Sequence, residues 1–270
     1  DPKDWEEKMK KYLRNIDNKI KIYGFIPVRM KASRFPGKPL VKILNKTMLE
    51  HVFERSKIYS KWENLLVTTC DKELVDFSYK KKYPCILTSK KHKRALDRVY
   101  EAAKKTNVNR NDIVVCVQGD EPLLYPNMIK KVVDVIIKKK VNSSVLAMEI
   151  INKDQFNDKN IVKIVNNSKG EVLYTSRSPI PNQNKKKIIN AKRIHGIFAF
   201  KMFELEKFYK TKQSSLEIIE ACDSNRICEN YGGQYVAFQK YLNTHSVDCK
   251  SDIKIVKKFM KKDNLYKIYK

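Results

Sequence analysis

The chain has 270 residues, 42% of them hydrophobic, and its 57 Lys and Arg against 30 Asp and Glu give a formal net charge of +27. This length fits one large domain with a real core, and no apolar run approaches the roughly 20 residues that a membrane helix needs, which excludes a membrane span. So much positive charge makes nucleic acid a candidate partner. The lysines are spread in pairs and triplets over the whole chain, however, so we interpret the charge as compositional drift and expect no nucleic-acid binding.

The first half of the chain alternates strands with helices. Residues 1–20 are predicted to form a polar, helical N-terminal extension, and residues 21–270 a single domain. The predicted strands cover 21–28, 64–69, 84–88 and 112–118. The predicted helices cover 47–60, 71–82, 96–105 and 127–140, and Thr47 with Glu50 predicts a capping box at the start of the first. This alternation indicates a layered α/β domain with a mainly parallel sheet.

After about residue 141 the pattern changes to strands with little helix between them, which predicts an antiparallel insert over about 141–200. Its predicted strands are SVLAMEI, IVKIV, EVLY and RIHGIFAF. A helix is then expected over 214–227, capped by Ser214 with Glu217 in the capping-box position. Residues 256–262 are expected to lie in a C-terminal helix.

The six cysteines give no sign of a disulfide framework or a zinc site. No two of them have C-x-x-C spacing, and the chain has only four His. We therefore expect reduced, buried thiols in an intracellular compartment. No signal peptide is visible, but the sequence starts at Asp1 rather than Met. The expected location is the cytoplasm, or an organelle if an upstream targeting segment has been removed.

The loop IPVRMKASRFPGKPL, residues 26–40, follows the first predicted strand and is rich in cations. Ligands of an open α/β sheet lie at the carboxyl ends of the strands, where Arg29, Arg34 and Lys38 can converge on one anion. With exposed backbone amides they would form a phosphate cradle. The loop is neither a G-x-G-x-x-G motif nor a Walker P-loop, and a solvated basic loop is an equal alternative.

A second polar cluster lies in VCVQGDEPLL, residues 115–124, where an apolar strand ends in Asp120 and Glu121. Mg²⁺ suits one or two such carboxylates together with substrate phosphates. The alternative is a plain strand-to-helix turn with Asp120 as the cap. Glycine is scarce in this chain, yet Gly37, Gly119 and Gly196 lie beside these polar residues, so we expect close backbone approach to a ligand there.

Several motifs together resemble the CMP-Kdo synthetases, the 3-deoxy-manno-octulosonate cytidylyltransferase family. The motifs are IPVRMKASRFPGKPL, LLVTTCD, VQGDEPLL, NIVKIV, LYTSRSPIP, HGIFAF, SSLEIIE and SVDCKSDI, in family order from about residue 22 to 260. The resemblance implies a three-layer α/β/α nucleotide-diphospho-sugar transferase-like fold, with an inserted antiparallel segment for homodimerisation. It also implies a Mg²⁺-dependent reaction of CTP with the acid sugar Kdo that gives CMP-Kdo and pyrophosphate.

The same resemblance assigns site residues. Arg29 and Lys38 would hold the triphosphate, while Asp120 and Asp248 would bind Mg²⁺. The implied nucleotide-binding residues are Arg29, Ser33, Arg34, Lys38, Arg98 and Gln118. The implied sugar-binding residues are Arg177, His195, Glu217 and Glu220, with Arg177 on the Kdo carboxylate. Plainer roles remain open: a helix cap for Asp248, a capping box for Glu217, a structural buried residue for His195 and a surface strand position for Arg177.

The stretch KKHKRALDRV, residues 90–99, departs most from this family. The family pattern is His-x-Ser-Gly-Thr-Asp/Glu-Arg, whereas this chain keeps His92, Asp97 and Arg98 but has Arg94, Ala95 and Leu96 between them. The lost residues are small or polar and line the nucleotide pocket in the family. The leading hypothesis is an active cytidylyltransferase for Kdo. The alternatives are a cytidylyltransferase for another sugar acid, a non-catalytic relative that binds nucleotide, and a basic nucleic-acid-binding protein.

Overall fold

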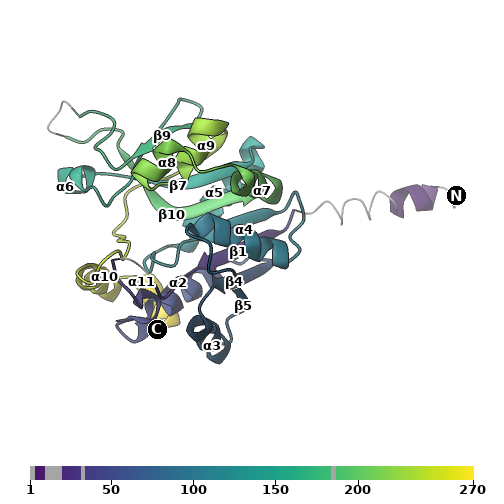
Figure 1. Ribbon diagram of the computed structural model, residues 1–270, viewed down its shortest axis with the longest axis horizontal. Coiled ribbons are helices and arrows are strands. Elements are labelled where there is room, and N and C mark those ends of the chain that lie inside the picture. The colour runs from purple at the N-terminus through teal and green to yellow at the C-terminus, as the bar shows by residue number, and fades with distance from the viewer. Residues whose placement is uncertain (1–3, 10–19, 32–33, 184–186) are drawn as a thin grey trace.

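The computed structural model describes residues 4–9, 20–31, 34–183 and 187–270. In this part of the chain, nine strands form one twisted sheet with helices on both of its faces (Figure 1). The strand order is β11-β7-β10-β6-β1-β4-β5. The bounds of these strands are β1 Ile22–Pro27, β4 Asn64–Thr69, β5 Cys85–Leu87, β6 Ile113–Val117, β7 Ser143–Glu149, β10 Lys192–Lys201 and β11 Gln234–Gln239.

The predicted α/β class is confirmed, with a core layer on each face of the sheet. Side chains alternate along β1, so that Ile22 and Ile26 face one cluster while Tyr23 and Phe25 face the other. The first cluster is covered by α2 Met48–Lys57, α3 Lys72–Lys80 and α5 Pro126–Lys139, and the second by α4 Ala95–Lys105, α7 Met202–Lys210 and α9 Ser224–Asn230. Phe25 and Ile26 are fully enclosed, and each such burial contributes about 1.5–3 kcal/mol to folding.

Parallel pairing brings several loops to one edge of the sheet. β1 is parallel to both β4 and β6, and β4 is parallel to β5. The carboxyl ends of these four strands therefore meet at the same edge, as predicted. The capping box of Thr47 and Glu50 is also confirmed at the start of α2, with both reciprocal hydrogen bonds present.

The strands predicted as an antiparallel insert over about 141–200 pair antiparallel with one another and belong to the central sheet. β10 is antiparallel to both β6 and β7, and β7 is parallel to β11, so these strands extend the central sheet. Only the hairpin of β8 Lys163–Asn166 and β9 Val172–Ser176 branches off, pairing with β10 through β8. The remaining elements are η1 Lys38–Leu40, the β2 Lys42–Ile43 and β3 Lys46–Thr47 pair, α6 Lys153–Asn157, α8 Ser215–Glu220, α10 Asp252–Lys261 and α11 Asn264–Tyr269.

The prediction of one helix over 214–227 is wrong. Ser214 and Glu217 do form the expected capping box, but the helix ends at Glu220 because Ala221 adopts the left-handed conformation, with a φ of 50°. A second helix, α9, starts at Ser224. This break turns the chain at the wall of the cavity described below.

The C-terminal helices are held against α2 by a buried polar network. Arg55, with no solvent exposure, pairs with Asp263, donates to Tyr269 Oη over 2.8 Å and donates to the carbonyl of Leu124 over 3.2 Å. Tyr125 Oη also donates to Asp263, over 3.1 Å. The network therefore joins α2 and the segment after β6 to α11 and its N-cap Asp263.

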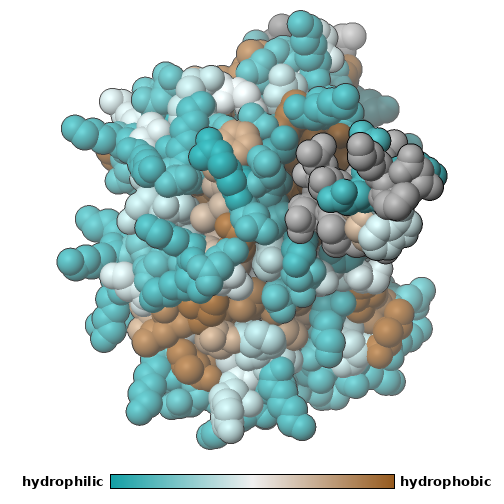
Figure 2. Space-filling model, turned by 90° about the vertical axis from the view of Figure 1, so that its right-hand side faces the viewer, coloured by the Kyte–Doolittle hydropathy of each residue, from teal (hydrophilic) through white to brown (hydrophobic). Residues whose placement is uncertain are grey.

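Residues 4–9 are helical, while the rest of the predicted extension up to residue 19 lies outside the described residues. The boundary at residue 20 therefore stays a prediction. Within the described ranges, no helix is long and apolar enough to cross a membrane. All six cysteines are free, and Cys116 and Cys222 are buried while the other four are partly exposed. Figure 2 shows hydrophilic side chains over most of one face, interrupted by a hydrophobic band.

Candidate active site

A cavity of about 760 Å³ opens at the carboxyl edge of the parallel strands. Its lining comes from the loop after β1, the start of α4, the turn after β6, the β9 end, the α8–α9 break and the segment before α10. Among the residues predicted from the sequence, the cavity is lined by Arg29, Arg34, Lys38, Arg98, Gln118, Asp120, Arg177 and Asp248. The predicted nucleotide-binding residue Ser33 lies outside the described residues.

The loop after β1 is folded back on itself. Gly37 has a φ of 74°, a conformation that favours glycine, and its N–H donates to the carbonyl of Met30 over 2.8 Å. The N–H of Met30 in turn donates to Asp71 Oδ2 over 2.7 Å. The short helix η1 then begins at Lys38 and directs this side chain back into the cavity.

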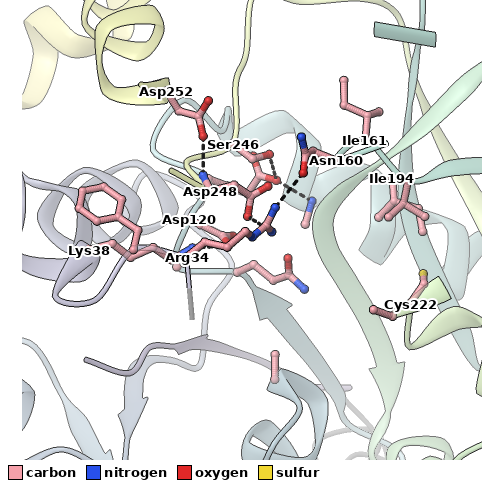
Figure 3. Close-up of a pocket in the computed structure, with 18 of the residues that line it drawn as sticks. Arg34, Lys38, Asp120, Asn160, Ile161, Ile194, Cys222, Ser246, Asp248 and Asp252 are labelled. Atoms are coloured by element: carbon pink, nitrogen blue, oxygen red, sulfur yellow. Dashed lines mark hydrogen bonds and ion pairs between the residues drawn. The ribbon is translucent and has the colours of Figure 1, made fainter. Parts of the chain in front are cut away.

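Two carboxylates that are far apart in the sequence converge with two of these cations (Figure 3). Lys38 Nζ lies 2.9 Å from Asp120 Oδ2, and the Arg34 guanidinium lies 2.8 Å from Asp248 Oδ1. The N–H of Val247 donates to the Asp120 carbonyl over 2.9 Å, which fixes the two acidic segments side by side. Burial, and then the nearby charge of Asp120, raise the pKa of Asp248, while Arg34 and Lys38 oppose the shift. Asp120 and Asp248 therefore share one electrostatic environment.

The turn after β6 is held by the carboxyl group of Glu121, which the sequence offered with Asp120 as a candidate Mg²⁺ ligand. Glu121, almost fully buried, accepts from the N–H of Gly196 over 3.0 Å and from Ser246 Oγ over 2.7 Å. Burial, and then Asp120, raise the pKa of Glu121 to about 7. Glu121 thus fastens the β6 turn to β10 and to the segment that contains Asp248.

Gly119 and Gly196 line the cavity and also lie close to other protein atoms. A Cβ on Gly119 would lie 2.3 Å from Val28 Cγ1, and a Cβ on Gly196 would lie 2.7 Å from Gln118 Oε1. Close contact with neighbouring protein atoms therefore requires glycine at both positions, and the approach of a ligand to them stays a prediction.

Arg98 and Arg177 line the cavity, but both donate hydrogen bonds to other groups of the protein. Arg98 NH1 donates to Thr88 Oγ1 over 2.5 Å and to the Ser89 carbonyl over 3.3 Å, which orders the loop before α4. Arg177 Nε donates to the Glu220 carbonyl over 2.9 Å, and its NH1 donates to the carbonyl of Lys159 over 3.1 Å. Among the described residues no acceptor is hydrogen-bonded to Arg177 NH2, so this nitrogen can donate to a ligand.

Three predicted sugar-binding residues do not line the cavity. His195 has no solvent exposure, and among the described residues neither ring nitrogen has a hydrogen-bond partner; its Nε2 lies 3.4 Å from Glu121 Oε2 without hydrogen-bond geometry. Burial, and then Arg193, lower the pKa of His195 well below its usual range, so the ring is neutral. This placement fits the plainer, structural role.

Glu217 and Glu220 instead support the wall of the cavity. Glu217 is fully buried and accepts from Arg226 Nε over 2.7 Å and from Arg226 NH2 over 2.6 Å. Glu220 accepts from Tyr174 Oη over 2.9 Å and from Ser176 Oγ over 2.7 Å, which ties α8 to β9. Both carboxylates are saturated by protein donors in this arrangement.

Sequence reasoning missed several cavity residues. Asn160 Oδ1 accepts from Arg34 NH1 over 2.8 Å, and Asp252 Oδ2 accepts from the N–H groups of Asp248 and Cys249 over 2.7 and 2.8 Å. Asp223 also lines the cavity, and so does Arg94, which the departure from the family pattern had already marked. Asn160 is the first residue of the quoted motif NIVKIV, whereas nothing in the local sequence distinguishes Asp223 from an ordinary helix cap.

Comparison with known proteins gives a consistent result. A family model described as "Cytidylyltransferase" matches residues 23–258. A 3-deoxy-manno-octulosonate cytidylyltransferase from Nitratidesulfovibrio vulgaris is 34% identical over 238 residues, covering 87% of this chain and 94% of the relative. One from Haemophilus influenzae is 30% identical over 249 residues, covering 88% and 98%. A solved structure of CMP:2-keto-3-deoxy-manno-octonic acid synthetase complexed with CTP matches with a TM-score of 0.80 and 25% identity, covering 90% of this chain and 99% of that one.

Proposed function

The chain belongs to the 3-deoxy-manno-octulosonate cytidylyltransferases, the CMP-Kdo synthetase family, and from this premise we propose that it transfers CMP from CTP to the anomeric hydroxyl of Kdo. Pyrophosphate is the second product, and Mg²⁺ is required. The observation that carries the proposal is the convergence of Lys38, Arg34, Asp120 and Asp248 in one cavity.

Charge neutralisation is the main task in such a reaction, because the anomeric oxygen attacks the α-phosphate and a highly charged pyrophosphate leaves. Arg29, Arg34 and Lys38 provide three cations from a single loop after β1. They would bind the triphosphate and stabilise the negative charge that develops on the leaving group. Since Lys38 and Arg34 contact carboxylates here, triphosphate binding would compete for these same cations.

Asp120 and Asp248 fit Mg²⁺, because this hard cation is bound by one or two carboxylates together with substrate phosphates. Both side chains remain partly exposed to the cavity, at 26% for Asp120 and 30% for Asp248. Among the described residues no larger group of acidic, His or Cys ligands gathers, so the substrate oxygens would have to complete the coordination. Bound there, Mg²⁺ would act as a Lewis acid and template for the phosphates.

The experiment that tests this proposal measures pyrophosphate release with Mg²⁺ for each of the four ribonucleoside triphosphates combined with Kdo and with other sugar acids. We expect release only with CTP and highest with Kdo. Release with CTP and another sugar acid, but not with Kdo, would favour the alternative acceptor. CTP binding without release for any acceptor would favour the non-catalytic alternative.

We also propose that the protein acts as a homodimer in the cytoplasm and that the antiparallel segment contributes to the interface. Three large apolar side chains of this segment are exposed, namely Ile151 at 51%, Leu173 at 57% and Ile189 at 47%. Burial of these side chains in a subunit contact would remove their apolar surface from water, which favours association. Light scattering on the purified chain tests this: a monomer mass at micromolar concentration contradicts the dimer.

A further inference from the structure

Lys163 is a fully buried lysine at the start of β8, in the motif NIVKIV, and the proposed function gives it no role. Its ammonium group donates to three backbone carbonyls, to Asp158 over 2.8 Å and to Ile161 and Arg177 over 2.7 Å each. A neutral amine has only two N–H groups, so three acceptors require the ammonium form. Burial of a charge is costly unless hydrogen bonds compensate for it, and here every donor of the group is used.

The three carbonyls belong to two segments of the cavity wall. Asp158 and Ile161 lie in the loop of residues 158–162, between α6 and β8, and all of this loop except Lys159 lines the cavity. Arg177, the residue after β9, lines the cavity as well. A single ammonium group therefore fastens the 158–162 loop to the chain that leaves β9.

The same loop holds the guanidinium of Arg177. Its NH1 donates to the carbonyl of Lys159 over 3.1 Å and to that of Asn160 over 3.3 Å. The direction of the guanidinium thus depends on where these two carbonyls lie, and both are in the segment that Lys163 fastens. Loss of the ammonium group would take a charge-assisted donor from each of its three carbonyls and would let the loop move.

The 158–162 loop also contacts the phosphate side of the cavity, but through exposed groups. Asn160 Oδ1 accepts from Arg34 NH1 over 2.8 Å, and Figure 3 shows Asn160 directed toward Arg34. Both residues are exposed, so water competes for the same groups and the contact adds little. Arg177, by contrast, is bonded to Lys163 directly. A change at Lys163 should therefore act mainly on Arg177.

We propose that Lys163 is a positioning residue, which holds the guanidinium of Arg177 in the direction that binds the carboxylate of the acceptor sugar. The proposal rests on the proposed function, since it deepens the acceptor side of the same reaction. Lys163 has no solvent exposure and uses all its donors within the protein, so it does not touch the substrate. It acts through Arg177, because a guanidinium binds a carboxylate well only in a narrow range of directions.

The test is Lys163→Met, which keeps the length of the side chain and removes its charge and donors. We expect the KM for Kdo to rise about ten-fold, while the KM for CTP and kcat each change less than about three-fold. Lys159→Met is the matched control, because it removes an exposed lysine from the same loop and keeps the carbonyl that Arg177 binds. It should leave both KM values unchanged.

Loss of stability has to be separated from loss of position. Asp263→Asn provides this comparison, because it breaks the buried pair with Arg55 at the start of α11. Urea unfolding measures the stability of both variants, and only Lys163→Met should raise the KM for Kdo. In an Arg177→Ala background, Lys163→Met should add less than about two-fold to this KM.

Four results would overturn the proposal: an unchanged KM for Kdo in Lys163→Met, equal increases in the KM of both substrates, the same increase in Asp263→Asn, or a full additional increase in the Arg177→Ala background. Each of them would show that Lys163 does not act on the acceptor through Arg177.

A measurement on the wild type covers the case in which Lys163→Met does not fold. Among the described residues Lys163 is the buried lysine, so its ammonium protons should exchange slowly with water and give a resolved NMR signal in nitrogen-labelled protein. Kdo should shift this signal and CTP should shift it much less, because the Arg177 carbonyl links the ammonium group to the acceptor side. Fast exchange in the free protein, or a signal that Kdo binding leaves in place, contradicts the positioning role. Absence of CMP-Kdo formation by the wild type would instead count against the proposed function.

Discussion

Lys38 Nζ lies 2.9 Å from Asp120 Oδ2 and equally 2.9 Å from the carbonyl of Val247, the residue before Asp248. One ammonium group thus joins the loop after β1, the turn after β6 and the segment before α10. These three segments provide the cations and the two acids on which the proposed chemistry depends. The side chains that hold the segments together are therefore the same ones that would bind the substrate.

Substitution of Asp120 by Asn should abolish turnover while leaving the fold intact. The amide keeps the shape but loses the charge that Mg²⁺ requires, so we expect kcat to fall by at least about 100-fold. Steady-state pyrophosphate release measures the change. Asp134→Asn, on the exposed side of α5, is the control and should retain full activity. Substantial turnover by Asp120→Asn would contradict the metal-binding role.

Substitution of Lys38 by Met should weaken use of CTP. Loss of a charge-assisted contact to phosphate costs about 3 kcal/mol in kcat/KM, or roughly 100-fold. The measurement is kcat/KM for CTP at saturating Kdo. Lys42→Met, a nearby exposed lysine on β2, should change this value less than about two-fold, because solvated charges contribute little. Equal effects of the two substitutions would argue against a specific role for Lys38.

Substitution of Asp263 by Asn should destabilise the fold. Arg55 has no solvent exposure and would lose its ionic partner, and breaking a buried pair in this way costs about 3–5 kcal/mol. Urea unfolding measures the difference. The exposed pair of Lys130 and Asp134 provides the comparison, since Asp134→Asn should cost less than about 1 kcal/mol. A similarly small loss for Asp263→Asn would show that the C-terminal network contributes little to stability.

Because His51 is buried, we expect the protein to lose stability in acid. Its Nε2 donates to the Ile43 carbonyl over 2.7 Å, and burial lowers its pKa from 6.5 to about 4. Between these two pH values the unfolded chain binds a proton that the folded chain does not, so stability falls as the pH drops from 6.5 to 4. Protonation of His51 alone should lower the free energy of unfolding by about 3 kcal/mol between pH 6.5 and pH 4.

The check is urea unfolding of the wild type and His51→Gln at pH 7 and pH 5. The wild type should lose more stability than the variant over this interval, because the variant cannot titrate at this position. His245→Gln, a partly exposed histidine that pairs with Asp252, is the control for removal of a histidine. Parallel losses in the wild type and His51→Gln would contradict the assignment.

Local patterns predicted the first half of the fold well because each element there is specified locally. The predicted strand 64–69 coincides with β4, and the Thr47 capping box marks the start of α2. The second half depends on tertiary contacts. β11, an edge strand, was not predicted because it mixes apolar with polar residues. The break at Ala221 was not predicted because the helical pattern of the sequence continues through it.

The residues of the candidate site also differ in how far the local sequence predicts them. Arg29, Lys38 and Asp120 could be predicted because they follow strands whose carboxyl ends meet at one edge. Glu217 and His195 were predicted as ligands only through the family resemblance, and the structure places both away from the cavity lining. Asp223 was missed because its exposure to the cavity depends on how α8 and α9 pack against α4, which no local pattern specifies.

CMP transfer from CTP to Kdo is tested most directly by incubating the purified chain with CTP, Kdo and Mg²⁺ and measuring the amounts of both products. We expect CMP-Kdo and pyrophosphate to appear in equal amounts, and neither to form when Mg²⁺ is chelated. Tight CTP binding with no pyrophosphate from Kdo, under conditions in which a bacterial relative turns over, would contradict this expectation.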